Sequence, residues 1–252
     1  MCRAYIFKIV RSPMTYLAII GVAAVFATNF LNGYAGSGDV VNHLEVFLGL
    51  DAFRKIIAVM SALPFAANFA EEWNSSVTAN CITRKNVGKY AGTNVGFCWI
   101  TSFLAVFLGM MIFVGIYMFI LPLYKPNPNP KVTPYGIFLD SGMPIIYVLA
   151  RVAVFAASCA MWSVMGMAMS AFFPNKYIAI CSPFVASYVI ERITMQLPGL
   201  LDFHKLSLSY IDNKASPIFA FSYSMGFFVL ISAVCGLGFY FIVRKKVQCE
   251  FN

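Results

Sequence analysis

Long runs of apolar residues, each long enough to cross a lipid bilayer, dominate this sequence, and short polar segments separate them. An α-helix needs about 20 apolar residues to cross the hydrocarbon core of a bilayer. The pattern therefore predicts six membrane-spanning helices, at about residues 14–31, 52–70, 91–121, 144–173, 177–197 and 217–243. Pro64 is expected to kink the second of them. The predicted fold is an all-α membrane protein with one transmembrane domain over residues 1–252.

Residues 2–12, which precede the first predicted span, have an amphipathic pattern. When they are plotted at about 100° per residue, Arg3, Lys8 and Arg11 share one side, and apolar residues other than Phe7 occupy the opposite side. This arrangement predicts a short helix that lies in the cytoplasmic interface of the membrane.

The composition excludes a soluble protein. Apolar residues make up 60% of the chain and charged residues 11%, against roughly 45–50% and about 25% in soluble domains. The net charge of +8 does not indicate nucleic-acid binding, because the basic residues form short clusters at the ends of spans and not one basic face.

The distribution of basic residues predicts the orientation of the chain. Segments assigned to the cytoplasm contain Lys or Arg at positions 3, 8, 11, 84, 85, 89, 176, 244, 245 and 246; segments assigned to the outside contain them at 54, 55, 125, 131, 205 and 214. Cytoplasmic loops carry an excess of Lys and Arg, so both termini are predicted to be cytoplasmic.

Motifs for catalysis or metal binding are missing from the sequence. It has no GxxxxGK[ST], GxSxG or HExxH motif, and His43 and His204 fall in predicted outer loops far from other candidate ligands. The seven cysteines show no CxxC or Cys/His spacing, and none lies in a predicted outer loop. We therefore expect no catalytic residues, no metal site and no disulfide framework.

Ionisable residues within predicted spans are candidates for function, because a charge at membrane depth is costly. Apart from Arg54 and Lys55 near the outer mouth of the second span, three such residues occur: Arg151 in the fourth span, and Glu191 and Arg192 in the fifth. Arg151 and Glu191 fall in the outer halves of their helices and are predicted to pair there. A place on a substrate path is the alternative for these groups, and Arg192 could instead extend to the outer interface.

The segment 71–90 is the longest polar interval on the predicted cytoplasmic side. Glu71 and Glu72 end the apolar run before it, and the next residues, Asn74, Ser75 and Ser76, suit a helix N-cap. The segment also carries a basic cluster, which consists of Arg84, Lys85 and Lys89. The pattern predicts a short connector helix that presents charged groups to a cytoplasmic partner; an ordinary solvated loop is the alternative.

This region, residues 65–93, resembles the permease subunits of type 2 ABC transporters. In that family an acidic residue ends the second span, and a small turn, a coupling helix, a Ser/Thr-Arg/Lys pair and a later basic residue follow. Here the matching residues are Glu71 and Glu72, Asn74 to Ser76, Thr83-Arg84 and Lys89. The glycine that is common in the small turn is absent.

The resemblance implies a function for the chain. It implies a multi-pass permease of the bacterial plasma membrane that pairs with a second permease, identical or homologous, and with separate ATPase subunits. ATP and Mg would bind to those subunits, and this chain would bind no cofactor. The length and short outer loops look most like permeases that export or expel antimicrobial peptides such as lantibiotics, so an amphipathic or lipid-like substrate is expected.

Two other classes of protein remain alternatives. A secondary transporter driven by an ion gradient would be expected to have acidic residues near the middle of the membrane, and Glu191 is the sole acid in a predicted span. An integral-membrane enzyme would need catalytic residues that the spans do not contain.

Overall fold

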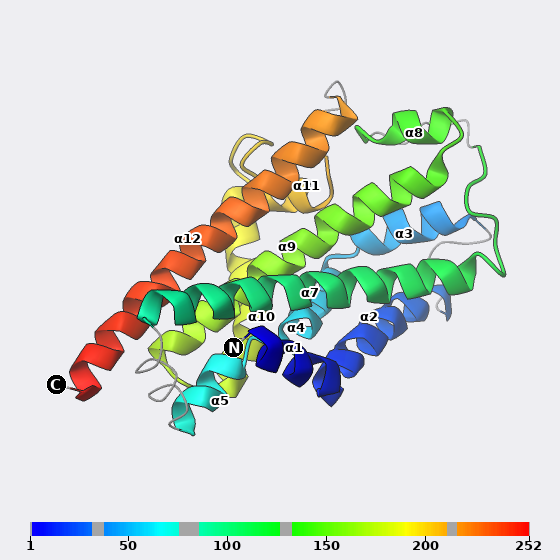
Figure 1. Cartoon of the computed structure of the whole chain (residues 1–252). Helices are drawn as coiled ribbons and strands as arrows, with labels where there is room; N and C mark the ends of the chain where they lie inside the picture. Colours follow the sequence, from blue (N-terminus) through cyan, green and yellow to red (C-terminus); the bar gives the residue numbers. More distant parts are fainter. Residues whose placement is uncertain (1, 32–37, 76–85, 127–132, 211–215, 252) are drawn as a thin grey trace.

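In a computed structural model the chain forms a bundle of α-helices (Figure 1). The structure describes residues 2–31, 38–75, 86–126, 133–210 and 216–251. Helices account for 81% of the described residues, which contain no strand. The predicted all-α class is therefore confirmed.

Eleven helices are described. They are α1 (Cys2–Arg11), α2 (Pro13–Leu31), α3 (Val40–Gly49), α4 (Asp51–Ala62), α5 (Asn68–Asn74), α7 (Val87–Tyr117), α8 (Gly136–Asp140), α9 (Pro144–Phe172), α10 (Lys176–Thr194), α11 (Phe203–Ser207) and α12 (Pro217–Phe251). Proline opens α2, α9 and α12, since the first turn of a helix tolerates a residue without an N–H. These starts agree closely with the predicted starts at 14, 144 and 217.

The bundle has two ends of different character (Figure 1). At the first, which we call the α5 end, α5 contacts α1 through Asn68 and Lys8, and Lys246 of α12 lies over the ring of Trp73. At the opposite end, which we call the α3 end, the short helices α3, α8 and α11 cover the long ones. Helix α9 packs against α4, α7, α10 and α12 and forms the centre of the bundle.

Small residues let the other helices approach α9 closely. Its sequence is rich in Ala and Ser, and many of these side chains are fully buried. At Gly166 an added Cβ would lie 2.5 Å from the carbonyl oxygen of Ala179 and 2.8 Å from Pro183, both on α10. The absence of a side chain at Gly166 is therefore required for the contact between α9 and α10.

The predicted second span is broken. Residues 63–67 form turns between α4 and α5, around Pro64, which has no N–H to continue the helix. The predicted kink at Pro64 is thus a complete interruption of the helix.

Within the described residues, three helical segments are long and apolar enough to cross a membrane: Val87–Tyr117, Pro144–Phe172 and Pro217–Cys249. A fourth is added if Tyr5–Arg11 and Pro13–Thr28, which meet at an angle of 55°, form one broken span. These apolar helices indicate a membrane protein. Helix α4 falls short because it has only 12 residues, among them Asp51, Arg54 and Lys55.

The ends of the connector differ from the prediction. Glu71 to Asn74 belong to helix α5, and Ser75 is its C-terminal cap. Asn74 and Ser75 therefore end a helix here, and the predicted start of a new helix at these two residues is wrong. At the other end of the connector, α7 begins at the N-cap Asn86, whose side chain accepts a hydrogen bond from the Gly88 N–H. The predicted site residues Ser76, Arg84 and Lys85 lie outside the described residues.

Candidate functional site

A buried carboxylate joins three helices at the α5 end. Glu72 of α5 is 7% exposed and accepts hydrogen bonds from the Tyr5 hydroxyl of α1 (3.2 Å) and the Tyr90 hydroxyl of α7 (2.7 Å). The Asn68 amide donates to its other oxygen at 2.9 Å. A hydrogen bond from Asn68 to Asn94 of α7, 3.1 Å long, extends the network. The described segments on both sides of residues 76–85 are thereby held together and against α1.

The position of Glu72 changes its predicted role. A side chain that is buried and already bonded to three donors has no free surface for a protein partner. Its neighbour Glu71 is half-exposed and lies 3.7 Å from the equally exposed Lys8 of α1. Exposed ion pairs of this kind contribute little to stability. Of these two acids, Glu71 is the one available to a partner, while Glu72 positions the helices.

Further exposed groups surround this network. Asn74 donates to the carbonyl oxygen of Pro174 at 3.1 Å, which links α5 to the turn between α9 and α10. Lys246 of α12 donates to the carbonyl oxygen of Phe172 at 2.9 Å and lies 5.5 Å from the centre of the Trp73 ring. Lys89 is exposed in the first turn of α7. The α5 end thus presents polar and basic groups on a tightly connected base.

The α3 end contains a buried arginine. Arg151 of α9 is fully buried and forms a two-pronged ion pair with Glu45 of α3, with distances of 2.8 Å from Nε and 2.7 Å from Nη2. The Tyr147 hydroxyl also donates to Glu45 at 2.8 Å, and Arg151 donates to the Leu208 carbonyl beyond α11. The cluster fastens α3 and the segment after α11 onto α9.

This arrangement overturns the predicted Arg151–Glu191 pair. Glu45 takes the arginine, and Glu191 of α10 instead contacts Lys55 and Arg54 of α4. Arg192 is exposed and lies over the ring of Tyr188, 5.6 Å from its centre. The three predicted membrane residues therefore have three separate environments.

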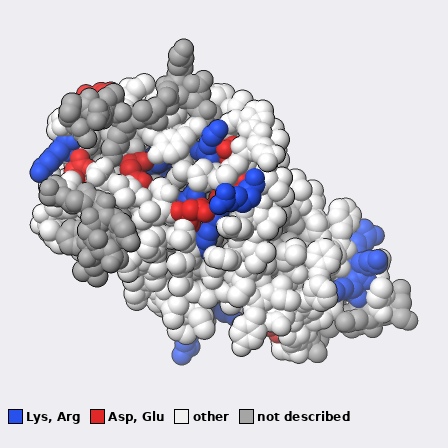
Figure 2. Space-filling view, turned by 180° about the vertical axis from the view of Figure 1, so that it is seen from behind, with Lys and Arg blue, Asp and Glu red and all other residues white. Residues whose placement is uncertain are grey.

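The second charged cluster at the α3 end, which we call the Glu191 cluster, joins α4, α10 and α11. Besides its contacts with Glu191, Arg54 contacts the Asp51 carboxylate at 2.6 Å and the Nδ1 atom of His204 at 2.8 Å. Burial raises the pKa of Asp51, but the charges of Lys55 and Arg54 more than offset this effect, so its pKa lies below the ordinary value. Figure 2 shows acidic and basic residues intermixed on one part of an otherwise largely uncharged face.

Asp51, Arg54, Lys55 and His204 were not among the predicted site residues. The prediction that His204 lies far from other candidate ligands is wrong. A signal for the cluster was available: a lone acid in an apolar run needs a cation, and two adjacent bases occur at the start of the predicted second span. The contribution of His204 depends on how residues 195–210 fold back, which no local pattern predicts.

A metal ion does not suit the Glu191 cluster. Donor atoms of Asp51, Glu191 and His204 lie within 4.8 Å of one another. However, the two carboxylates are already neutralised by Arg54 and Lys55. A divalent ion would stand beside two fixed cations and lack the excess negative charge that binds such ions.

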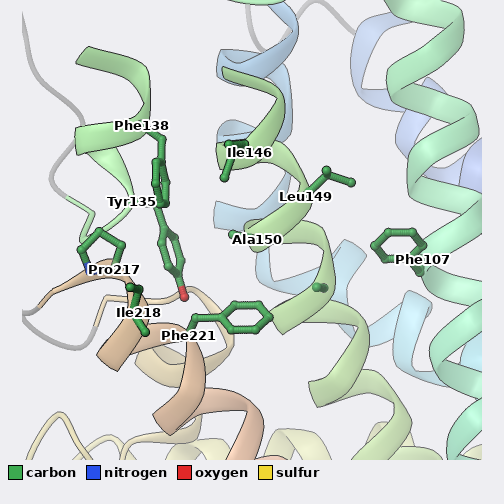
Figure 3. A pocket seen from close by; sticks show the side chains of 10 residues that line it. Phe107, Tyr135, Phe138, Ile146, Leu149, Ala150, Pro217, Ile218 and Phe221 are labelled. Atoms are coloured by element: carbon green, nitrogen blue, oxygen red, sulfur yellow. The ribbon is translucent and has the colours of Figure 1, made fainter. Parts of the chain in front are cut away.

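An apolar pocket of about 420 Å³ lies between α7, α8, α9 and α12 (Figure 3). Phe107, Tyr135, Phe138, Ile146, Leu149 and Phe221 are among its lining residues. Its volume falls within the range of about 300–1,000 Å³ that is typical of small-molecule sites. The lining is suited to a hydrocarbon group and offers no charged group to fix a polar one.

Comparisons of the chain with family models, with curated proteins and with solved structures gave no match.

Proposed function

We propose that this chain is the membrane-spanning permease subunit of an ATP-driven ABC transporter, with six spans and both termini in the cytoplasm. The observation that carries the proposal is the Glu72 network, which ties α1, α5 and α7 together beside the polar connector. The motif at residues 65–93 resembles that of type 2 ABC permeases. The Glu72 network adds a physical means by which a partner bound to the connector could move the spans.

The network suits a coupling role because it makes the connector's base rigid. A force on residues 76–85 would reach the end of α5 and the start of α7, which share the Glu72 carboxylate. Buried hydrogen bonds to a charged group contribute about 1.5–3 kcal/mol each, so the joint resists being pulled apart. The force would then pass to α1, to α4 and to the full length of α7.

The docking surface in this proposal consists of the exposed residues Glu71, Asn74 and Lys89 together with Ser76, Arg84 and Lys85 of the connector. An ATPase subunit, which carries ATP and Mg, would bind there through acidic groups. A second permease, identical or homologous, would pack beside this chain in the membrane. Helix α12 offers an apolar surface to this second permease or to lipid, because only 22% of the most apolar part of α12 is buried.

The proposed substrate is amphipathic, such as an antimicrobial peptide or a lipid-like compound, and is exported or expelled. The apolar pocket supports this class, because its lining would accept an acyl chain or an apolar side chain and would disfavour an ionic solute (Figure 3).

The proposal is tested by co-purification. The tagged chain is isolated from its native membrane in mild detergent, and a P-loop ATPase is expected to accompany it with substrate-stimulated ATP turnover. Arg84→Glu should weaken this association about tenfold, which corresponds to ~1.4 kcal/mol, because the substitution replaces an attraction with a repulsion. Glu72→Gln should leave association intact and reduce substrate stimulation of ATP turnover.

The matched control is Lys125→Glu, which reverses one exposed charge in a predicted outer loop and should change neither quantity. Recovery of the intact chain without an ATPase, or equal binding by Arg84→Glu and Lys125→Glu, would contradict the proposal.

The Glu191 cluster favours one alternative, a secondary transporter driven by protons, because a buried carboxylate beside a histidine between helices can take part in proton transfer. The ATP-driven permease and the secondary transporter differ in their energy source. Transport that survives ATP depletion but stops when a protonophore collapses the proton gradient would favour the alternative and exclude the ATPase-driven function.

A further inference from the structure

The contact between Arg54 and His204 distinguishes the neutral histidine from the protonated one. Arg54 Nη2 lies 2.8 Å from His204 Nδ1. A guanidinium group has five donors and no acceptor, so Nδ1 must carry the lone pair that accepts this bond. This contact is therefore one that a neutral imidazole with its proton on Nε2 can make.

The charges around His204 balance while the imidazole is neutral. The groups that surround it are Asp51, Arg54 and Lys55 of α4, Glu191 of α10, and Asp202 and Lys205 beside and on α11. They comprise three acids and three bases. Helix α9 adds Phe155, Cys159 and Trp162 to this region and no charge. One added proton would thus be the single uncompensated charge of the cluster.

Protonation would exchange the partners of His204. A proton on Nδ1 would point at the Arg54 guanidinium and turn an attraction at 2.8 Å into a repulsion between two cations. The nearest carboxylate oxygen is Glu191 Oε2, which lies 3.7 Å from Nδ1. Arg54 would retain the Asp51 carboxylate at 2.6 Å and the Ser207 hydroxyl at 3.2 Å.

We propose that His204 is a proton-binding site that works as an acid-sensitive latch: its imidazole is bonded to Arg54 of α4 when neutral and moves to Glu191 of α10 when protonated, so that α11 turns about the Ser207–Arg54 hydrogen bond, which is kept in both states. The side chain of His204 is 26% exposed, so protons from solvent reach it. Histidine is also the side chain whose charge ordinarily changes between about pH 5 and 8. The proposal concerns the α3 end alone and does not depend on the energy source for transport.

Trp162 provides a built-in reporter of the latch. Its ring lies 5.7 Å from that of Phe203, the first residue of α11, and its side chain is buried. In a Trp73→Phe/Trp99→Phe protein, Trp162 is the only tryptophan left of three. Acrylamide quenching of its fluorescence in lipid nanodiscs, measured between pH 8 and 5, follows the position of α11 over Trp162.

The expected result is one transition in the quenching constant within that pH range. His204→Gln should abolish it, since glutamine keeps a polar side chain but cannot gain a proton. His43→Gln, which replaces the only other histidine, should retain it. A transition that persists in His204→Gln, or a flat profile in the parent protein, would overturn the proposal.

Charge variants separate a proton site from a merely structural residue. Asp51→Asn removes a negative charge near the imidazole and should lower the midpoint pH; Arg54→Gln removes a positive charge and should raise it, each by about 1 pH unit or more. Midpoints that stay fixed or move in the same direction would refute the latch. Circular dichroism at pH 8 checks the fold of each variant. If Arg54→Gln does not fold, the shift of the midpoint pH in Asp51→Asn, a substitution at a half-exposed residue, tests the proposal by itself.

Discussion

Arg151 shows how one buried charge can depend on a single distant partner. It is fully buried, and Glu45, its ion-pair partner, has a side chain that is 11% exposed. Removing one member of a buried pair leaves an uncompensated charge and costs about 3–5 kcal/mol. Glu45→Gln should therefore lower the free energy of unfolding by an amount in this range. Unfolding in mixed micelles with increasing SDS, followed by circular dichroism, measures the change.

Two further variants test the explanation for Arg151. The double variant Glu45→Leu/Arg151→Met should be more stable than Glu45→Gln alone, because no charge is left unpaired. Arg192→Met removes an exposed arginine that contacts Tyr188 and should have little effect. Equal losses for Glu45→Gln and Arg192→Met would show that the buried pair does not contribute to stability as argued.

At the scale of elements, the contact between α9 and α10 depends on Gly166. An alanine Cβ at this position would meet backbone and proline atoms at 2.5 and 2.8 Å, and neither group can rotate away. The helices would have to separate, so Gly166→Ala should destabilise the protein by about 1–3 kcal/mol. The same SDS titration measures the loss.

The matched control for Gly166 is Gly96 in the interior of α7, where an added Cβ meets no atom within 4 Å. Gly96→Ala should be neutral or stabilising by up to about 1 kcal/mol, because alanine favours the helix. If both substitutions had the same effect, the close approach of α9 and α10 would not be the cause.

At the scale of the whole molecule, the two ends of the bundle are predicted to face opposite sides of the membrane. In a cysteine-free protein, a cysteine in place of Lys205, whose side chain is 48% exposed, should react with an impermeant maleimide added to sealed cells. A cysteine in place of the exposed Lys245 of α12 should react only after permeabilisation. The opposite labelling pattern would reverse the proposed orientation, and labelling of both from outside would exclude it.

The helical segments were predictable because their signals are local. Apolar runs and the prolines at 13, 144 and 217 mark helix starts that the structure reproduces within one residue. The amphipathic pattern of residues 2–12 likewise corresponds to α1. Local signals were less reliable at the connector, where Asn74 and Ser75 suit the start of a helix by residue type but lie at the end of α5.

The sequence by itself determined the all-α class, the starts of several helices and the residues with unusual charges, because each depends on composition or on neighbours along the chain. Only the tertiary structure decided which charges meet. Arg151 and Glu191 have similar predicted depths, but depth does not specify the direction in which a side chain leaves its helix. The packing of α3 against the bundle brings Glu45 to Arg151, and the fold of residues 195–210 brings His204 to Arg54. These contacts join segments more than 100 residues apart, so no local pattern could have predicted them.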